Sequence, residues 1–510
     1  MNKLLAVAFL LIPSYFCIAQ APRISYAEPE REDSRRTDFE IIGKMNGNFL
    51  VYKNNKNDHT ISLYDEQMNL KDREKLDFIP ERWINVDFIT YPDFSYLIYQ
   101  YERKNVVYCS VVKIDAAGRK ISEPMELDTT EIGFASNNKI YTTINSDDKQ
   151  RIMIFKINSK NSKNFYFTTL LYDNNLNLIR RDRMNMPMDE RNEFFTDFML
   201  ANDGEMLFGK FLRPSSNSEY ISKVSMVAKF PDSSEFSVRP VDIGFRLLDE
   251  LKLKVDNTNK RILVNALYYR ERRGNVEGVY SLFWDKSSNT KIIDTVFAFD
   301  DELRGLAKSA DGNRRYAFND YYIKSITTRK DGGFVIISES LYSSSRGNTF
   351  NRWDYSRWGS PWMSPMDYYY WSPIYSPGFM PWGGNRFNNF ATRYFADNIM
   401  ILSFNREGGL EWSNVVQKSQ FDDENDNTLS FQTLNTGGEL HFLFNQFEKR
   451  ALMLTDQTIG ADGKITRVPT LKNLDKGYEF MPRFAKQVSA RQVIVPCLYR
   501  GYLCFAKIDF

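Results

Sequence analysis

The stretch Leu171–Leu178 reads Leu-Tyr-Asp-Asn-Asn-Leu-Asn-Leu. An apolar strand ends here, a polar turn follows, and a second strand restarts on an aliphatic residue. Further copies of this pattern, some of them looser, occur at 63–70, 114–121, 283–290, 404–410 and 459–465. Asp, Asn and Gly suit such a turn because they tolerate left-handed backbone or cap the turn with their own side chains. The repeated turns, with short β-branched or aromatic runs between them, indicate an all-β fold.

A second repeated element precedes the first, namely a Gly-containing turn that leads into an apolar strand. It occurs at 46–50, 203–207, 331–335 and 436–440. Together the two elements divide the chain into units of about 45 to 60 residues, each long enough for four strands. The units lie near 38–80, 81–129, 130–190, 191–244, 245–303, 304–425, 426–475 and 476–510. This repeat predicts a β-propeller of seven or eight blades over residues 38–510. Two β-sandwich domains are the alternative.

The last of these units is one strand short. We expect the N-terminal segment, residues 20–37, to supply the missing strand from within Pro22 to Ala27. A twisted four-stranded sheet cannot bury both of its faces alone, so each blade needs neighbours on both sides. Closing the ring in this way also protects the terminal sheet edges.

The composition excludes two broad classes of protein. The 510 residues include 67 Lys and Arg against 65 Asp and Glu, whereas an electrostatic nucleic-acid binder concentrates a basic excess on one face. A hydrophobic fraction of 42% is ample for a packed core, so wholesale disorder is excluded.

The first residues have the features of a secretory signal peptide. Lys3 precedes the apolar run Leu4–Ile12, and small residues before Gln20 predict cleavage after Ala19, so that residues 1–19 are removed. A lipoprotein with its lipid on Cys17 is the alternative, but bulky residues precede that cysteine. The apolar run is much shorter than the roughly 20 residues that span a bilayer. We therefore expect an exported protein in the periplasm or at the outer membrane, without a transmembrane segment of its own.

The sixth unit contains a long aromatic and Pro/Gly-rich insertion, which we place at residues 343–397. Prolines recur through it every few residues, which excludes a regular helix or a central strand. A free aromatic patch of this size is typical of a contact surface. The candidate partner-binding residues are Trp353, Trp358, Trp362, Tyr368, Tyr369, Tyr370, Trp371, Tyr375, Phe379 and Trp382.

Three interpretations of the insertion remain open. It packs over its own blade as a small extra core, it binds a protein partner in the cell envelope, or its rings stack on the sugars of a glycan. Trp and Tyr provide a large contact area with little side-chain entropy to lose, which suits the second interpretation.

Catalytic motifs are scarce in this sequence. His59 and His441 are far apart in the chain, and we expect each to be a surface or hydrogen-bonded imidazole rather than a metal ligand. There is no nucleophile-elbow, phosphate-loop or Cys-x-x-Cys pattern. We therefore expect no enzymatic activity, with a carboxylate-based glycan-active enzyme as the alternative.

Three charged stretches are candidate ion-binding sites. Phe421–Asn427 has enough oxygen ligands for calcium but lacks the pattern of an EF-hand, so we expect a solvated loop, with bound calcium as the alternative. Arg180–Arg183 and Arg270–Gly274 are short or of mixed charge, and we expect exposed turns. No metal site and no cofactor is predicted.

Cys497 and Cys504 flank a short stretch in which Arg500-Gly501 forms a two-residue hairpin turn. This register places the cysteines opposite each other, so that they either form a disulfide or remain two buried thiols. Cys109 lies in an apolar strand and is expected to fill space in the core.

The short leader ending in Ala19-Gln20, the many Asn and Asp turns and the Tyr/Trp/Pro-rich insertion resemble exported propeller-type proteins of Bacteroidota-like bacteria. The resemblance covers most of the chain and implies no particular activity. Many such bacteria use a C-terminal sorting domain for surface export, whereas this sequence ends in a strand at Ala506–Phe510. We therefore expect a non-enzymatic envelope scaffold that binds a protein partner through its insertion. A carbohydrate-binding or carbohydrate-active propeller is the alternative.

Overall fold

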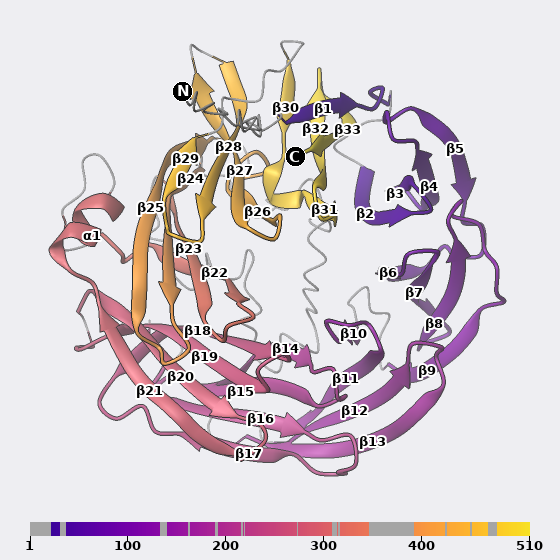
Figure 1. Ribbon diagram of the computed structural model, residues 1–510. Helices are drawn as coiled ribbons and strands as arrows, with labels where there is room; N and C mark the ends of the chain where they lie inside the picture. The colour runs from indigo at the N-terminus through magenta and orange to yellow at the C-terminus, as the bar shows by residue number, and fades with distance from the viewer. Residues whose placement is uncertain are drawn as a thin grey trace, which may run out of the picture.

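The computed structural model describes residues 22–30, 37–132, 140–161, 164–188, 192–215, 218, 220–272, 274–308, 314, 317–345, 392–423, 426–448, 451–467 and 477–510. These residues form eight antiparallel sheets that follow one another in a ring around a common axis (Figure 1). In the first seven sheets, the spatial order of the four strands is their order in the sequence. The fold is an eight-bladed β-propeller. The alternative of two β-sandwich domains is therefore wrong.

The first, second and fourth sheets begin close to the unit boundaries expected from the repeat, whereas the third begins at Tyr141 rather than near 130. Their strands are β2 (Thr37–Met45), β3 (Asn48–Asn55), β4 (Asp58–Tyr64) and β5 (Leu70–Lys75); β6 (Trp83–Thr90), β7 (Phe94–Arg103), β8 (Val106–Asp115) and β9 (Met125–Glu131); β10 (Tyr141–Asn145), β11 (Arg151–Asn161), β12 (Asn164–Asp173) and β13 (Leu178–Pro187); β14 (Glu193–Leu200), β15 (Met206–Leu212), β16 (Lys223–Lys229) and β17 (Ser237–Val241).

The other four sheets include one short α-helix and one 3₁₀ turn between strands. Their elements are β18 (Leu247–Asp256), β19 (Arg261–Tyr269), β20 (Val276–Asp285) and β21 (Thr290–Ala298); α1 (Asp301–Ala307); β22 (Tyr321–Thr328), β23 (Phe334–Ser345), β24 (Thr392–Phe404) and β25 (Leu410–Asp422); β26 (Phe431–Asn435), β27 (Glu439–Glu448), β28 (Ala451–Gly460) and β29 (Ile465–Arg467); β30 (Tyr478–Phe480), η3 (Pro482–Phe484), β31 (Lys486–Ser489), β32 (Gln492–Tyr499), β33 (Tyr502–Asp509) and β1 (Arg23–Tyr26).

The eighth sheet joins the two ends of the described chain. Its strand order is β1-β33-β32-β30, with β31 also paired to β32. β1 lies within Pro22 to Ala27, the stretch from which we expected the closing strand, and it pairs with β33 along its whole length. The backbone N–H of Ala27 also donates to Phe505 O over 2.8 Å. The outermost strand of the last blade therefore comes from the start of the chain.

A cluster of buried apolar side chains fills each junction between neighbouring sheets. At the closing junction, Phe39 and Ile41 of the first sheet pack against Ile494 and Phe505 of the eighth. All four side chains are at most 3% exposed. Because the core is divided among junctions, each blade depends on both neighbours for burial of its apolar surface.

The repeated polar turn has the same hydrogen bonds in several blades. In the β12–β13 turn, Asp173 Oδ1 accepts from the backbone N–H of Asn175 and of Asn177, each over 2.8 Å. Leu176 has a positive φ of 62° and its N–H donates to Asp173 O. Equivalent bonds begin at Asp65, Asp115 and Asn405. These turns confirm that the recurring Asp and Asn residues cap the turn with their own side chains.

At one end of the blades, hydrogen bonds connect the turns of adjacent sheets. The links, taken around the ring, are Asn46 N to Pro92 O (3.3 Å), Tyr91 Oη to Lys149 O (2.9 Å), Asp148 N to Asn202 Oδ1 (3.3 Å), Asn202 N to Asn257 Oδ1 (3.0 Å), Asn259 Nδ2 to Arg329 O (3.3 Å), Asn435 N to Gln487 Oε1 (3.2 Å) and Lys44 Nζ to Gln492 Oε1 (2.9 Å). We call this end of the propeller the turn face. The opposite end carries the connections between second and third strands and those between blades.

The outer strands differ most from expectation. Arg180–Arg183, expected to form an exposed turn, lies inside β13. The expectation was wrong because β13 is the outermost strand of its sheet, where one face is solvated and the apolar signal is weak. The Arg270–Gly274 stretch does connect two strands, β19 and β20, as expected for its described residues.

Substitution of one glycine in the repeated turns provides a test of how tightly neighbouring blades pack. Gly463 has a φ of +77°, and a Cβ there would lie 2.6 Å from the ring of Trp412 in the neighbouring blade. Gly437 has a similar φ of +94° with nothing within 4 Å. Replacing Gly437 by Ala should therefore cost only the left-handed backbone penalty of roughly 1–2 kcal/mol. Gly463→Ala should cost about 1–3 kcal/mol more, because the added methyl overpacks the junction.

Chemical denaturation of the two variants measures this difference directly. Equal losses of unfolding free energy would contradict the close approach of Gly463 to Trp412.

Candidate functional site

The candidate partner-binding aromatic residues lie between β23 and β24, outside the described residues. The two strands themselves reach into the predicted insertion, since β23 extends to Ser345 and β24 begins at Thr392. Residues 343–345 and 392–397, which we assigned to the insertion, therefore belong to these strands. What the structure describes is the root of the insertion on the sixth sheet.

A row of three aromatic side chains crosses this root. Tyr342, Phe395 and Phe421 occupy successive opposed positions on β23, β24 and β25. The rings of Tyr342 and Phe395 are stacked, with centroids 4.5 Å apart and planes at 10°. The Phe421 ring is 6.4 Å from Phe395, and its residue is 48% exposed. We call these three residues the aromatic row.

Charged groups fix the position of the aromatic row. Arg393 donates from Nε and Nη2 to the two carboxylate oxygens of Asp423 over 2.5 and 2.9 Å. The guanidinium group also lies over the Phe421 ring, 4.8 Å from its centroid. Tyr342 Oη donates to Asp397 Oδ2 over 2.8 Å, and burial together with this carboxylate raises the pKa of Tyr342. A cation over an exposed ring and a bidentate ion pair give this edge a defined shape.

A fully buried ion pair lies beneath the root. Lys418 Nζ is 2.7 Å from Glu339 Oε1, and both side chains are 0% exposed. Ser430, which precedes the seventh sheet, donates to Glu339 Oε2 over 2.5 Å. Burial alone would raise the pKa of Glu339, but the ammonium groups of Lys418 and Lys324 outweigh it and the pKa lies below its usual value. Burial lowers the pKa of Lys418, and the carboxylate of Glu339 opposes that effect. Through Ser430, the pair connects the sixth blade to the start of the seventh.

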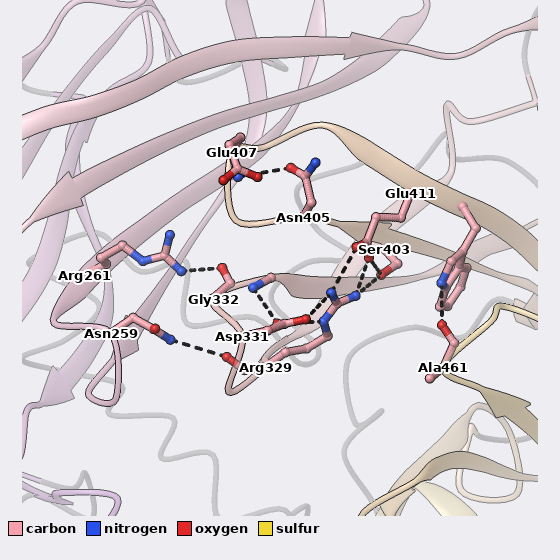
Figure 2. Close-up of polar contacts among 12 residues, drawn as sticks. Asn259, Arg261, Arg329, Asp331, Gly332, Ser403, Asn405, Glu407, Glu411 and Ala461 are labelled. Atoms are coloured by element: carbon pink, nitrogen blue, oxygen red, sulfur yellow. Dashed lines mark hydrogen bonds and ion pairs between the residues drawn. The ribbon is translucent and has the colours of Figure 1, made fainter.

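The other end of the sixth blade is held at the turn face (Figure 2). Arg329, which follows β22, donates to both carboxylate oxygens of Asp331 and to Glu411. From the fifth blade, Asn259 Nδ2 donates to Arg329 O, and Arg261 donates to Gly332 O. The hydrogen bonds from Arg329 lower the pKa of Asp331 to about 2. The blade that carries the insertion is thus fixed to both neighbours.

Both histidines have hydrogen-bonding partners in the structure. His59 Nδ1 is 2.6 Å from Tyr52 Oη, and burial lowers the pKa of His59 to about 4. His441 Nδ1 is 2.9 Å from Asp456 Oδ2. Both imidazoles are buried on strands and hydrogen-bonded, which is one of the two environments expected for them.

The stretch suggested as a calcium loop binds cations of the chain itself. Asp423 pairs with Arg393, and Asp426 pairs with Arg483. Within the described part of the chain, no group of three or more His, Cys, Asp or Glu residues is arranged to hold a metal ion. Nor does any helix of that part have the length and apolarity needed to cross a membrane.

The C-terminal hairpin has the expected register. Cys497 lies opposite Cys504, and Leu498 lies opposite Leu503. The two sulfur atoms are 2.9 Å apart and both cysteines are free buried thiols in this structure, so the disulfide stays a prediction. Cys109 is fully buried in the core between the second and third sheets, in agreement with its expected role.

The aromatic row was not recognised from the sequence. Its members come from three strands that are far apart in the chain, and only the strand register brings them together. The available signal was the run Arg393–Ala396, which is aromatic enough for a strand but was included in the insertion.

No protein-family model matches the chain, and no curated protein matches it. Among solved structures, prolyl oligopeptidase B from Galerina marginata is 8% identical with a TM-score of 0.40, and the match covers 92% of this chain and 56% of that one. An ulvan lyase is 11% identical with a TM-score of 0.36, covering 82% and 90% of the two chains. Dihydro-heme d1 dehydrogenase is 10% identical with a TM-score of 0.35, covering 93% and 73%. The chain thus spans little more than half of the peptidase, and likeness at this level carries no activity or ligand with it.

The buried pair beneath the root provides a test of how the sixth blade is held. Lys418→Met leaves Glu339 buried without its main counter-charge, and we expect a loss of about 3–5 kcal/mol in unfolding free energy. The double variant Lys418→Met/Glu339→Gln should recover part of this loss. Denaturant unfolding at neutral pH measures both.

A surface ion pair supplies the matched control. Lys291, which is 47% exposed, lies 2.9 Å from Asp294, and Lys291→Met should cost at most about 1 kcal/mol. Similar losses for Lys418→Met and Lys291→Met would contradict a structural role for the buried pair.

Proposed function

We propose that this protein is a non-enzymatic scaffold of the cell envelope, located in the periplasm or at the outer membrane. Its propeller presents the aromatic insertion to a protein partner. The observation that carries the proposal is the aromatic row. It places the exposed ring of Phe421 on β25, beside β24, the strand that follows the segment containing Trp353 to Trp382.

The chemistry of the root suits protein recognition. Aromatic and Arg side chains are enriched in the central, energetically dominant part of protein interfaces. Phe421 and Arg393 provide such a pair at the surface, with the guanidinium group stacked over the ring. Tyr and Trp anchors lose little side-chain entropy on binding, so the aromatic insertion adds contact area efficiently.

The contacts that fix the sixth blade to its neighbours also favour binding of a protein partner. Lys418 and Glu339 hold one end of the blade, while Arg329 and its partners hold the other. Because the supporting sheet is already fixed, association does not have to order it, which removes one entropic cost of binding.

A carbohydrate-binding propeller is the second candidate function. It is favoured by a polar hollow between the second and third sheets, whose volume is about 680 Å³ and whose lining includes three basic side chains. Small-molecule sites have volumes of about 300–1,000 Å³. This hollow is separate from the insertion, so the two candidate functions are tested by different variants.

Deletion of residues 351–389 tests the docking proposal. We expect the shortened protein to keep its thermal unfolding temperature within a few degrees, because the described core at the junctions is unchanged. In pull-downs from native membranes, a partner recovered with the full-length protein should be lost with the shortened one. Phe421→Ser should weaken recovery of the same partner at least several-fold, since hot-spot truncations commonly cost 2 kcal/mol or about 30-fold.

Phe245→Ser is the matched control, because Phe245 is 100% exposed on the fourth blade's connection to the fifth. It should leave recovery of the partner unchanged. A collapse of thermal stability on deletion would show instead that the insertion is part of the core. Unchanged partner recovery by the shortened protein would contradict docking through this segment.

A further inference from the structure

The hollow between the second and third sheets is built from one face of the third sheet. Lys156 lies opposite Thr168, and Thr168 lies opposite Arg183, on β11, β12 and β13. Directly opposed residues in a sheet project from the same face. Asn158 and Arg181 share the face of this row and lie two positions from it, on opposite sides. The outer strand β9 of the second sheet supplies the facing wall, including Thr130 and Glu131.

Asp128 neutralises the deepest cation of the hollow. Its Oδ2 is 2.6 Å from Lys156 Nζ, and its Oδ1 accepts from Arg181 Nη2 over 2.7 Å. Lys156 also donates to Thr129 O and to Thr130 Oγ1, each over 2.8 Å. The Lys156 ammonium group is therefore fully used in joining the two blades, and its role is structural.

Two guanidinium groups remain available at the rim. Arg181 is 56% exposed at its side chain and contributes one nitrogen to Asp128. Arg183 is exposed, and its guanidinium group lies over the Tyr166 ring at 5.3 Å. In the described part of the chain, no carboxylate forms an ion pair with Arg183. A guanidinium group is well suited to a planar carboxylate, which it binds through paired hydrogen bonds.

The hollow also offers hydrogen-bonding groups for hydroxyls. Asn158 Oδ1 is buried and accepts no hydrogen bond from the described residues. A buried carbonyl oxygen without a donor is unfavourable, so a ligand hydroxyl that donates to it would relieve this cost. Glu131 is exposed at the opposite wall and is a further acceptor.

We infer that this hollow binds an acidic saccharide, with successive sugar carboxylates on Arg181 and Arg183 and a hydroxyl group on Asn158. The ligand class is that of uronic acids and short uronate oligosaccharides. The inference deepens the carbohydrate-binding alternative given above and does not depend on docking of a protein by the insertion.

Calorimetric titration of the full chain with trigalacturonate and with its methyl ester tests the assignment. The ester keeps the ring hydroxyls and the shape but removes the negative charges. We expect trigalacturonate to bind at least tenfold more tightly than the ester. Arg183→Gln should weaken trigalacturonate binding at least tenfold without a change in unfolding temperature, because Arg183 is exposed. Arg272→Gln, an exposed arginine on the β19–β20 connection, should leave binding unchanged.

The results of these titrations distinguish failure of this particular site from failure of carbohydrate binding by the protein. Equal binding of acid and ester, unaffected by Arg183→Gln, would overturn this site while leaving a carbohydrate-binding function elsewhere. Inorganic sulfate that binds as tightly as trigalacturonate would overturn the saccharide assignment in favour of a simple anion site. If neither oligosaccharide binds, this inference fails, whereas the pull-down test of the insertion is unaffected.

Discussion

The whole structure depends on one constraint, which is that each sheet is apolar on both faces and therefore needs two neighbours. Tyr52, Tyr280 and Phe283 are among the largest side chains in the molecule and are fully buried at junctions between blades. No blade can satisfy this requirement alone, and an open row of blades would leave two apolar faces in water. Pairing of β1 with β33 removes that problem by making the first and last sheets neighbours.

Polar groups then determine how neighbouring blades are aligned. Apolar packing is non-directional, whereas hydrogen bonds such as Asn202 N to Asn257 Oδ1 require a particular orientation. Buried ion pairs such as Lys229 with Asp182 add little net stability once desolvation is counted, but they connect specific strands of adjacent sheets. The polar links at the junctions therefore specify the arrangement that the apolar core stabilises.

The repeat could be predicted from the sequence because its signal is local. Asp173 and its equivalents hydrogen-bond within four residues, so the turn is encoded where it forms. The blade count stayed at seven or eight because the last sheet is composed of both ends of the described chain. The aromatic row and the hollow could not be predicted, because Tyr342, Phe395 and Phe421 meet only through strand register. Likewise, Arg181 and Asp128 come from different blades.

The difference between the two ends of the propeller has a consequence for protein engineering. Turns on the turn face are hydrogen-bonded to the next blade, so lengthening them would disturb the alignment of the ring. The β7–β8 hairpin lies at the other end, where Lys104 and Asn105 form a tight two-residue turn with positive φ values of 53° and 62°. A foreign peptide grafted at such a hairpin would be displayed on a rigid support, and several hairpins around the same rim would allow multivalent display at fixed spacing.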